Sequence, residues 1–253
     1  MKTKKKTPAL SSVKELNFKF PKSWQELSQK QLKSVFVFLS AYPEIAALVK
    51  IACYFSNLVI VRKVDDGLFS CRLAQEQGVH TVTISSVEMV AMTDAFEWMK
   101  EPGKVPVLLG NLYGNTAIDT ALHGVPFETY LMLENLFQGY LMSNDEKAVC
   151  EMASLVYPGE TIKVLKPFEV FALCLWFTQL KAMFSSSFPN FFKPVSGSSA
   201  VSMVDVMHAE IRALTGGDIT KTSLVLEADT WVALAELDAK AREAEEFNKL
   251  SNK

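Results

Sequence analysis

Histidine and cysteine are scarce in this chain, which has three His and four Cys among its 253 residues. The cysteines are too far apart to form a CxxC pair, and no histidine has a second His or Cys at helical spacing. His208 and Glu210 form an HxE motif, but the PCxxC pattern that accompanies it in zinc deaminases is missing. We therefore expect no metal-binding residues, and free thiols in a reducing environment.

Long apolar runs are missing as well. The densest one, Val170–Phe177, lies between Glu169 and Lys181 and is far shorter than the roughly 20 residues that a membrane span requires. The basic start of the chain is followed by no apolar stretch of the kind found in signal peptides. These absences predict a cytoplasmic protein without a membrane span. Attachment to a membrane surface through the lysines at 2–6 and an amphipathic helix is an alternative.

The motifs of common catalytic sites are also missing. A phosphate-binding loop requires Gly-Lys-Ser/Thr, whereas the glycine-containing segment 110–116 ends in Asn115-Thr116. There is no G-x-S-x-G motif, although Cys150 or Cys174 with a distant histidine stays open, because catalytic triads assemble in space. We expect no catalytic residues, no cofactor-binding residues and no cofactor, and we expect that the protein is not an enzyme.

Charge is distributed unevenly along the chain. The net charge is -2, yet nine lysines against two glutamates stand in the first 33 residues, so the remainder is acidic. We interpret 1–15 as a disordered basic tail, with a weak contact to nucleic acid or to an acidic partner as the alternative. The net charge predicts no specific binding of nucleic acid.

The part from 16 to 104 combines strand and helix patterns. Leu16–Phe20 alternates like a short strand. Two adjacent capping boxes then predict the start of a helix over 32–41, and Pro43 predicts the first turn of another helix that ends near Asn57. The two boxes pair Ser23 with Glu26 and Ser28 with Gln31.

A β-hairpin and a third strand follow. The segments 59–61 (Val-Ile-Val) and 68–71 (Leu-Phe-Ser-Cys) flank Asp65-Asp66-Gly67, a turn sequence typical of hairpins, and 80–84 has the pattern of another strand. A third capping box, Ser85 with Glu88, predicts a helix that ends near residue 100.

The rest of the chain is a linker and a helical part. Residues 105–125 are rich in Gly, Asn and Pro and predict a loop or linker, and 126–253 predicts a helical C-terminal part. The expected helices cover about 127–142, 145–156, 167–184, 202–214 and 221–250. The fold class is therefore mainly α with a small antiparallel β-sheet (α+β).

Aromatic residues gather in a loop between two of these helices. Phe188, Phe191 and Phe192 lie close to two prolines and a Ser/Gly run, which indicate an irregular segment. Such side chains either fold back onto the core as a plug or bind a partner. We predict that they bind a partner, with the plug as the alternative.

The last helix carries an apolar stripe at i+3/i+4 spacing. Its large members are Trp231, Leu234, Leu237 and Phe247, and alanines take over the stripe after Leu237. We predict that these four residues bind a partner, and a second subunit is one candidate for that partner. The alternative is the last helix of an ordinary core.

Two segments together resemble small phage and prophage morphogenesis proteins. The first is Phe18-Lys19-Phe20-Pro21-Lys22-Ser23-Trp24-Gln25-Glu26-Leu27-Ser28-Gln29-Lys30-Gln31-Leu32, which is similar to the strand and "Pro…Ser-Trp-x-Glu-Leu-Ser/Thr-x-x-Gln-Leu" helix entry of these proteins. The second is 212–218 (Arg-Ala-Leu-Thr-Gly-Gly-Asp) with Trp231-x-x-Leu234-x-x-Leu237. The resemblance covers less than a quarter of the chain and has no site motif, so no functional residue is carried over.

The resemblance implies a non-enzymatic protein of virion assembly, such as a tail-assembly chaperone or a connector accessory. Its expected partners are other proteins, namely virion or tail components, with a homo-oligomer as a further candidate. The alternative hypothesis is an enzyme or small-ligand-binding protein whose pocket lies between the sheet and the helices, with 103–124 as its loop.

Overall fold

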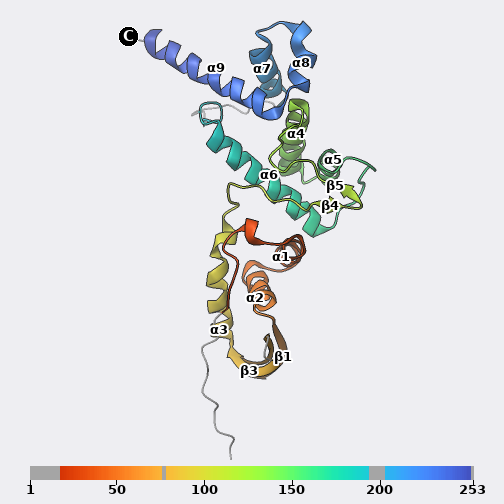
Figure 1. Ribbon diagram of the computed structural model, residues 1–253, viewed down its shortest axis with the longest axis vertical. Helices are drawn as coiled ribbons and strands as arrows, with labels where there is room; N and C mark the ends of the chain where they lie inside the picture. The colour runs from red at the N-terminus through yellow and green to blue at the C-terminus, as the bar shows by residue number, and fades with distance from the viewer. Residues whose placement is uncertain (1–17, 76–77, 194–202, 252–253) are drawn as a thin grey trace, which may run out of the picture.

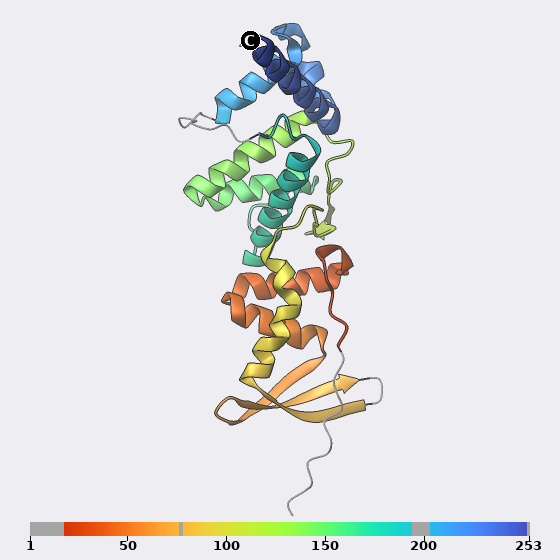
Figure 2. The ribbon, with the colours of Figure 1, turned by 90° about the vertical axis from the view of Figure 1, so that its left-hand side faces the viewer.

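The molecule is elongated, with a small β-sheet at one end of its long axis and the C-terminal helix at the other (Figures 1 and 2). The computed structural model describes residues 18–75, 78–193 and 203–251. Helical residues make up 61% of it, which confirms the expected mainly α fold with a small antiparallel sheet. No helix within these ranges has both the length and the apolar character needed to cross a bilayer.

The described residues of the N-terminal half form three α-helices, two 3-10 helices and the sheet. In chain order its elements are η1 (Trp24–Glu26), α1 (Gln29–Ala41), α2 (Glu44–Phe55), β1 (Leu58–Asp65), β2 (Leu68–Gln75), β3 (Gly78–Ser85), α3 (Ser86–Ala91) and the 3-10 helix η2 (Met92–Lys100).

The C-terminal half is helical, as expected. After the two-residue strands β4 (Asn111–Leu112) and β5 (Asn115–Thr116) it contains α4 (Phe127–Ser143), α5 (Glu146–Val156), α6 (Pro167–Ser187), α7 (Met203–Thr215), η3 (Ile219–Lys221), α8 (Thr222–Glu227) and α9 (Thr230–Ser251).

Only one of the first two predicted capping boxes forms. At the start of α1 the Ser28 N–H donates to Gln31 Oε1 at 2.9 Å, and the Gln31 N–H donates to Ser28 Oγ. The Ser23 side chain makes no capping bond, because the Glu26 carboxylate instead accepts the Lys22 N–H at 2.9 Å. The first box is therefore a wrong prediction and the second is confirmed.

The strand predicted over Leu16–Phe20 is also wrong for its described residues, 18–20, which adopt no regular structure. Residues 16 and 17, and the predicted tail 1–15, lie outside the described residues. The aromatic rings account for the difference, because Phe20 packs against Phe96 at a centroid distance of 5.0 Å. Side-chain packing, rather than pairing with another strand, holds this segment.

The hairpin and the third strand are confirmed. The antiparallel order is β1-β2-β3, with Leu58 opposite Leu73 and Cys71 opposite Val82. Gly67 has a φ of 75°, a conformation that a tight turn requires and that glycine adopts without strain. One face of the sheet covers a small cluster of its own: Leu58, Cys71, Leu73, Ile84 and Met89.

The helix predicted after Ser85 is α-helical only in its first turns. The capping box with Glu88 forms, since the Glu88 N–H donates to Ser85 Oγ at 3.1 Å. From Met92 the chain continues as the 3-10 helix η2, where the Thr93 hydroxyl donates to the Val90 carbonyl at 2.6 Å. Such a local side-chain bond competes with the backbone pattern of an α-helix.

Residues 105–125 are irregular but packed. Leu108, Leu112 and Leu122 are buried, and the Gln29 amide of α1 donates to the Leu108 carbonyl at 3.1 Å. The segment 110–116, considered above as a phosphate loop, contains a β-hairpin in which the two-residue strands β4 and β5 pair with each other.

Helix α6 joins the two halves. Ala172 belongs to the N-terminal core with Phe36 of α1, whereas Trp176 and Phe177 lie at the centre of the larger C-terminal core. The rings of Phe36 and Phe171 lie 5.8 Å apart across this junction. Helix α6 is apolar around most of its circumference because it contributes residues to both cores.

The helix predicted over 221–250 is wrong in one respect, because it breaks at Ala228–Asp229 into α8 and α9. Asp229 Oδ1 accepts the N–H groups of Trp231 and Val232, which makes this aspartate the cap of α9. The expected break at Thr215–Asp218 is present, with both of its glycines at positive φ.

Candidate functional site

The candidate site with the most sequence signal is α9 and the loop that precedes α7. The beginning of α9 is tied to the segment before α4. The Thr230 N–H and hydroxyl both donate to the Val125 carbonyl, at 2.9 and 2.8 Å, and Leu234 and Leu237 are buried in the C-terminal core. These two predicted partner-binding residues therefore contact the chain itself.

Trp231 is a cross-link within the fold. Its indole N–H donates to the Ala121 carbonyl at 2.7 Å, and its ring stacks on His123 at 4.6 Å. It also meets Phe184 and Phe188 edge-on, each at 5.4 Å. The structure thus brings together two of the predicted partner-binding residues, Trp231 and Phe188, as packing partners.

The aromatic loop lies on α9. Phe188 is buried, and Phe191 and Phe192 are half-buried against the C-terminal core. The Asp238 carboxylate accepts the N–H groups of Asn190 and Phe191, at 2.7 and 3.0 Å, and the Asn190 amide at 2.9 Å. This arrangement has the geometry of the plug alternative and leaves Phe191 and Phe192 partly accessible.

Although desolvation favours its neutral form, these three donors hold the pKa of the Asp238 carboxyl below its usual value. The carboxylate thereby acts as a cap for the loop. No feature of the loop sequence alone points to Asp238, which lies 48 residues from Asn190.

The second half of α9 is different, because it leaves the body of the molecule (Figure 1). Phe247 is 69% exposed and Leu250 is 73% exposed. Phe247 is therefore the predicted partner-binding residue that is most accessible. Leu250 was missed by the sequence analysis, although it stands three residues further along the helix.

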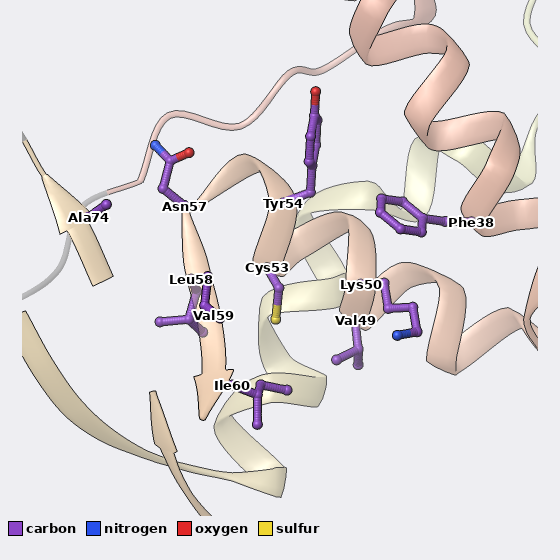
Figure 3. Close-up of a pocket in the computed structure, with 10 residues that line it drawn as sticks. All are labelled: Phe38, Val49, Lys50, Cys53, Tyr54, Asn57, Leu58, Val59, Ile60 and Ala74. Carbon is purple, nitrogen blue, oxygen red and sulfur yellow. The ribbon is translucent and has the colours of Figure 1, made fainter. Parts of the chain in front are cut away.

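An apolar groove lies at the other end of the molecule, between α2 and β1 (Figure 3). Its volume is about 590 Å³ and Lys50 is its one charged lining residue. The Lys50 ammonium lies 4.3 Å from the centre of the Tyr42 ring, a cation–π contact. Sequence reasoning missed this groove; the three consecutive apolar residues 59–61 in a half-exposed hairpin were its signal.

A second groove, of about 720 Å³, runs along α6 between α1 and α4. Neither of these two grooves is lined by residues of 103–124. The alternative hypothesis placed a ligand pocket between the sheet and the helices, and the first groove lies there. The loop 103–124, which the hypothesis assigned to that pocket, does not line it.

The four cysteine thiols and the buried Glu169 carboxyl are held in environments set by the fold. Burial raises the pKa of all four cysteine thiols, that of Cys174 to about 11, which disfavours the reactive thiolate. The buried Glu169 accepts the Lys166 N–H at 2.8 Å as the cap of α6, and its hydrogen bond with the Tyr113 hydroxyl raises the pKa of Tyr113 to about 12. Across the described ranges, no three His, Cys, Asp or Glu residues are grouped so as to hold a metal ion.

One carboxyl has a pKa near neutrality. Desolvation, together with the nearby charge of Glu134, raises the pKa of Glu210 on α7 to about 7. Glu134 pairs with Lys181, at 2.5 Å, while its other oxygen is buried without a hydrogen-bond partner among the described residues. This cluster lies between helices α4, α6 and α7 and borders no described groove.

Comparison with known proteins adds no relative, since no family model, no curated protein and no solved structure matches this chain.

Proposed function

We propose that this chain is a non-enzymatic assembly protein of a phage or prophage, a tail-assembly chaperone or connector accessory that acts in the host cytoplasm through helical protein–protein surfaces. The two segments that resemble phage morphogenesis proteins are its sequence support. Trp24 of the first segment is buried in the N-terminal core, and Leu234 of the second is buried in the C-terminal core. Both segments are therefore determinants of the fold.

The observation that carries the proposal is the contrast between internal polar groups and external apolar ones. The carboxylates of Glu169, Asp229 and Asp238 accept backbone N–H groups of the chain itself. In contrast, α9 extends into solvent, and its residues Phe247 and Leu250 are exposed. Large apolar side chains close together on a projecting helix are typical of a protein-binding surface.

The test is affinity capture of the tagged full chain from its native host at low salt, with the co-purifying proteins identified by mass spectrometry. We expect tail, portal or capsid components with the native chain, and their loss with Phe247→Ser. Val232→Ser is the matched control, because Val232 is on the same helix and is 64% exposed.

Recovery of the same virion components with Phe247→Ser would remove α9 from the proposal. Recovery of no virion component with the native chain would overturn the proposal itself.

A further inference from the structure

Two unpartnered apolar features lie at opposite ends of this elongated molecule. One is the end of α9, and the other is the groove between α2 and β1 beside the sheet. Both views place the end of α9 and the sheet at the two ends of the long axis (Figures 1 and 2). A protein with a projection at one end and a receptor at the other can bind a second copy of itself head to tail.

The projection is apolar with an acidic border. Glu243 stands four residues before Phe247, and Glu246 stands four residues before Leu250, so each carboxylate is next to one of the exposed apolar side chains. Both glutamates are exposed, and neither has an ion-pair partner in the part of the chain that the structure describes.

The groove is apolar with a basic border. Val59 and Ile60 of β1 are 61% and 45% exposed at its mouth, and Cys53 and Val49 of α2 form its opposite wall (Figure 3). A volume of about 590 Å³ suits a few inserted side chains rather than a whole helix. Lys50 supplies the border charge and has no carboxylate within ion-pair distance among the described residues.

The N-terminal region that contains the groove and helix α9 also have opposite net charges. Between Phe18 and Gln75 there are eight Lys and Arg against four Asp and Glu, whereas α9 has five Asp and Glu against three Lys and Arg. Opposite charge at two ends of one molecule steers the end of one copy towards the other end of the next.

We propose that this chain self-associates head to tail, with Phe247 and Leu250 of one copy inserted into the α2–β1 groove of a second copy and with Glu243 and Glu246 facing Lys50. Binding within one copy is prevented by the length of the molecule. The interface is heterologous, so it closes into a ring or grows into a filament. The inference deepens the proposed function by naming the partner of the α9 end; it is tested on the purified chain, without virion proteins, so the two can fail separately.

The first experiment is sedimentation velocity of the purified full chain over a range of concentrations at low and high salt. We expect association that grows with concentration and weakens with salt. Phe247→Ser should weaken it about tenfold or more, because Phe247 is inserted into the groove. Lys50→Glu should also weaken it, because it places a like charge opposite Glu243 and Glu246 at the border. Val232→Ser should leave it unchanged, and thermal unfolding monitors the fold of each variant.

The second experiment separates head-to-tail binding from other modes. Phe247→Ser and Val59→Asp, each monomeric alone, should form a 1:1 dimer when mixed, because one retains the groove and the other retains the α9 end. A chain that carries both Lys50→Glu and Glu246→Lys should regain association that Lys50→Glu alone loses.

Three results would overturn the proposal. The first is a native chain that stays monomeric at every concentration. The second is loss of association with Val59→Asp but not with Phe247→Ser, which indicates pairing between β1 strands. The third is loss with Phe247→Ser but not with Lys50→Glu, which indicates contact between two α9 helices or binding at another surface.

Discussion

The two halves of α9 have the same sequence pattern and different environments. The stripe that begins at Trp231 continues through Leu234 and Leu237 to the alanines at 241 and 244. Leu234 and Leu237 are buried, yet the end of the helix projects from the core. Helical periodicity shows which residues share a face, but not whether another element covers that face. Coverage depends on where the rest of the chain lies.

The first half is covered because three segments converge on it. Val125 binds Thr230, Ala121 binds the Trp231 indole, and the loop around Asn190 is capped by Asp238. Beyond Asp238 the helix is half-buried at 239–241, and Glu245 forms an ion pair with Lys193 of the loop. Helix α9 therefore has a packed first half and a solvent-exposed end.

The largest expected effect compares two truncations on this helix. Leu234→Ala removes a fully buried side chain and should lower the free energy of unfolding by about 2–5 kcal/mol. Phe247→Ala should change it by no more than about 0.5 kcal/mol, because its side chain is already in water. Denaturant unfolding at low protein concentration, where association is absent, measures both.

Equal losses from the two variants would contradict the division of α9. A large loss with Phe247→Ala, in particular, would show that its exposed side chain contacts the chain itself.

The second effect concerns the loop on the structural half. Asp238→Asn removes the charge that accepts three hydrogen bonds and should lower the free energy of unfolding by about 1–3 kcal/mol. Hydrogen exchange of the Asn190 and Phe191 amides should accelerate. Because the folded-state pKa of Asp238 is lowered, its contribution is present above the unfolded pKa and is lost as the pH falls through the folded value.

Glu236→Gln is the control for this variant, since Glu236 is on the solvent side of the same helix and pairs with Lys240. A slow-exchanging loop in Asp238→Asn would show that the aromatic side chains alone hold it in place.

The sequence predicted the local part of the fold well and the long-range part poorly. Capping boxes at Ser28 and Ser85 and the turn at Gly67 are encoded within a few residues, and all three are present, whereas the equally local box at Ser23 does not form. The aspartates that organise the candidate site are not of this kind. Asp238 binds residues about 48 positions away, and Asp229 binds Gly124 across 105 positions. A local sequence pattern around each aspartate does not show which distant residue it binds.

The third effect is a pH dependence of stability, and it arises from Glu210 on α7, a helix that contacts α9. The folded-state pKa of Glu210 is about 7, which is above the usual value of 4.5 for a glutamate. The free-energy cost of ionising it in the fold therefore appears as the pH rises from 4.5 to 7, and it is complete above pH 7. Glu210→Gln should therefore stabilise the protein at pH 8 by about 1–2 kcal/mol, with little change at pH 4.

Thermal unfolding of both proteins between pH 4 and 8 measures this effect, with Glu243→Gln as the exposed control. The charges that face Glu210 are those of Glu134 and, through its ion pair with Glu134, Lys181. Equal stabilisation at pH 4 and pH 8 would mean that packing, rather than ionisation, distinguishes the variant.

The smallest effect is expected at the boundary of the two halves. Hydrogen bonds from Lys193, and then from Lys249, lower the pKa of Glu245 to about 2, but all three side chains are in water, where ion pairs contribute little. Glu245→Gln should leave unfolding at pH 7 almost unchanged, and even this difference should disappear as the pH falls from about 4.5 towards 2, where the native carboxyl becomes neutral. If Glu245→Gln instead destabilised the protein as much as Asp238→Asn, the packed part of α9 would extend past Asp238 to Glu245. The exposed part would then shrink to the last turns around Phe247 and Leu250.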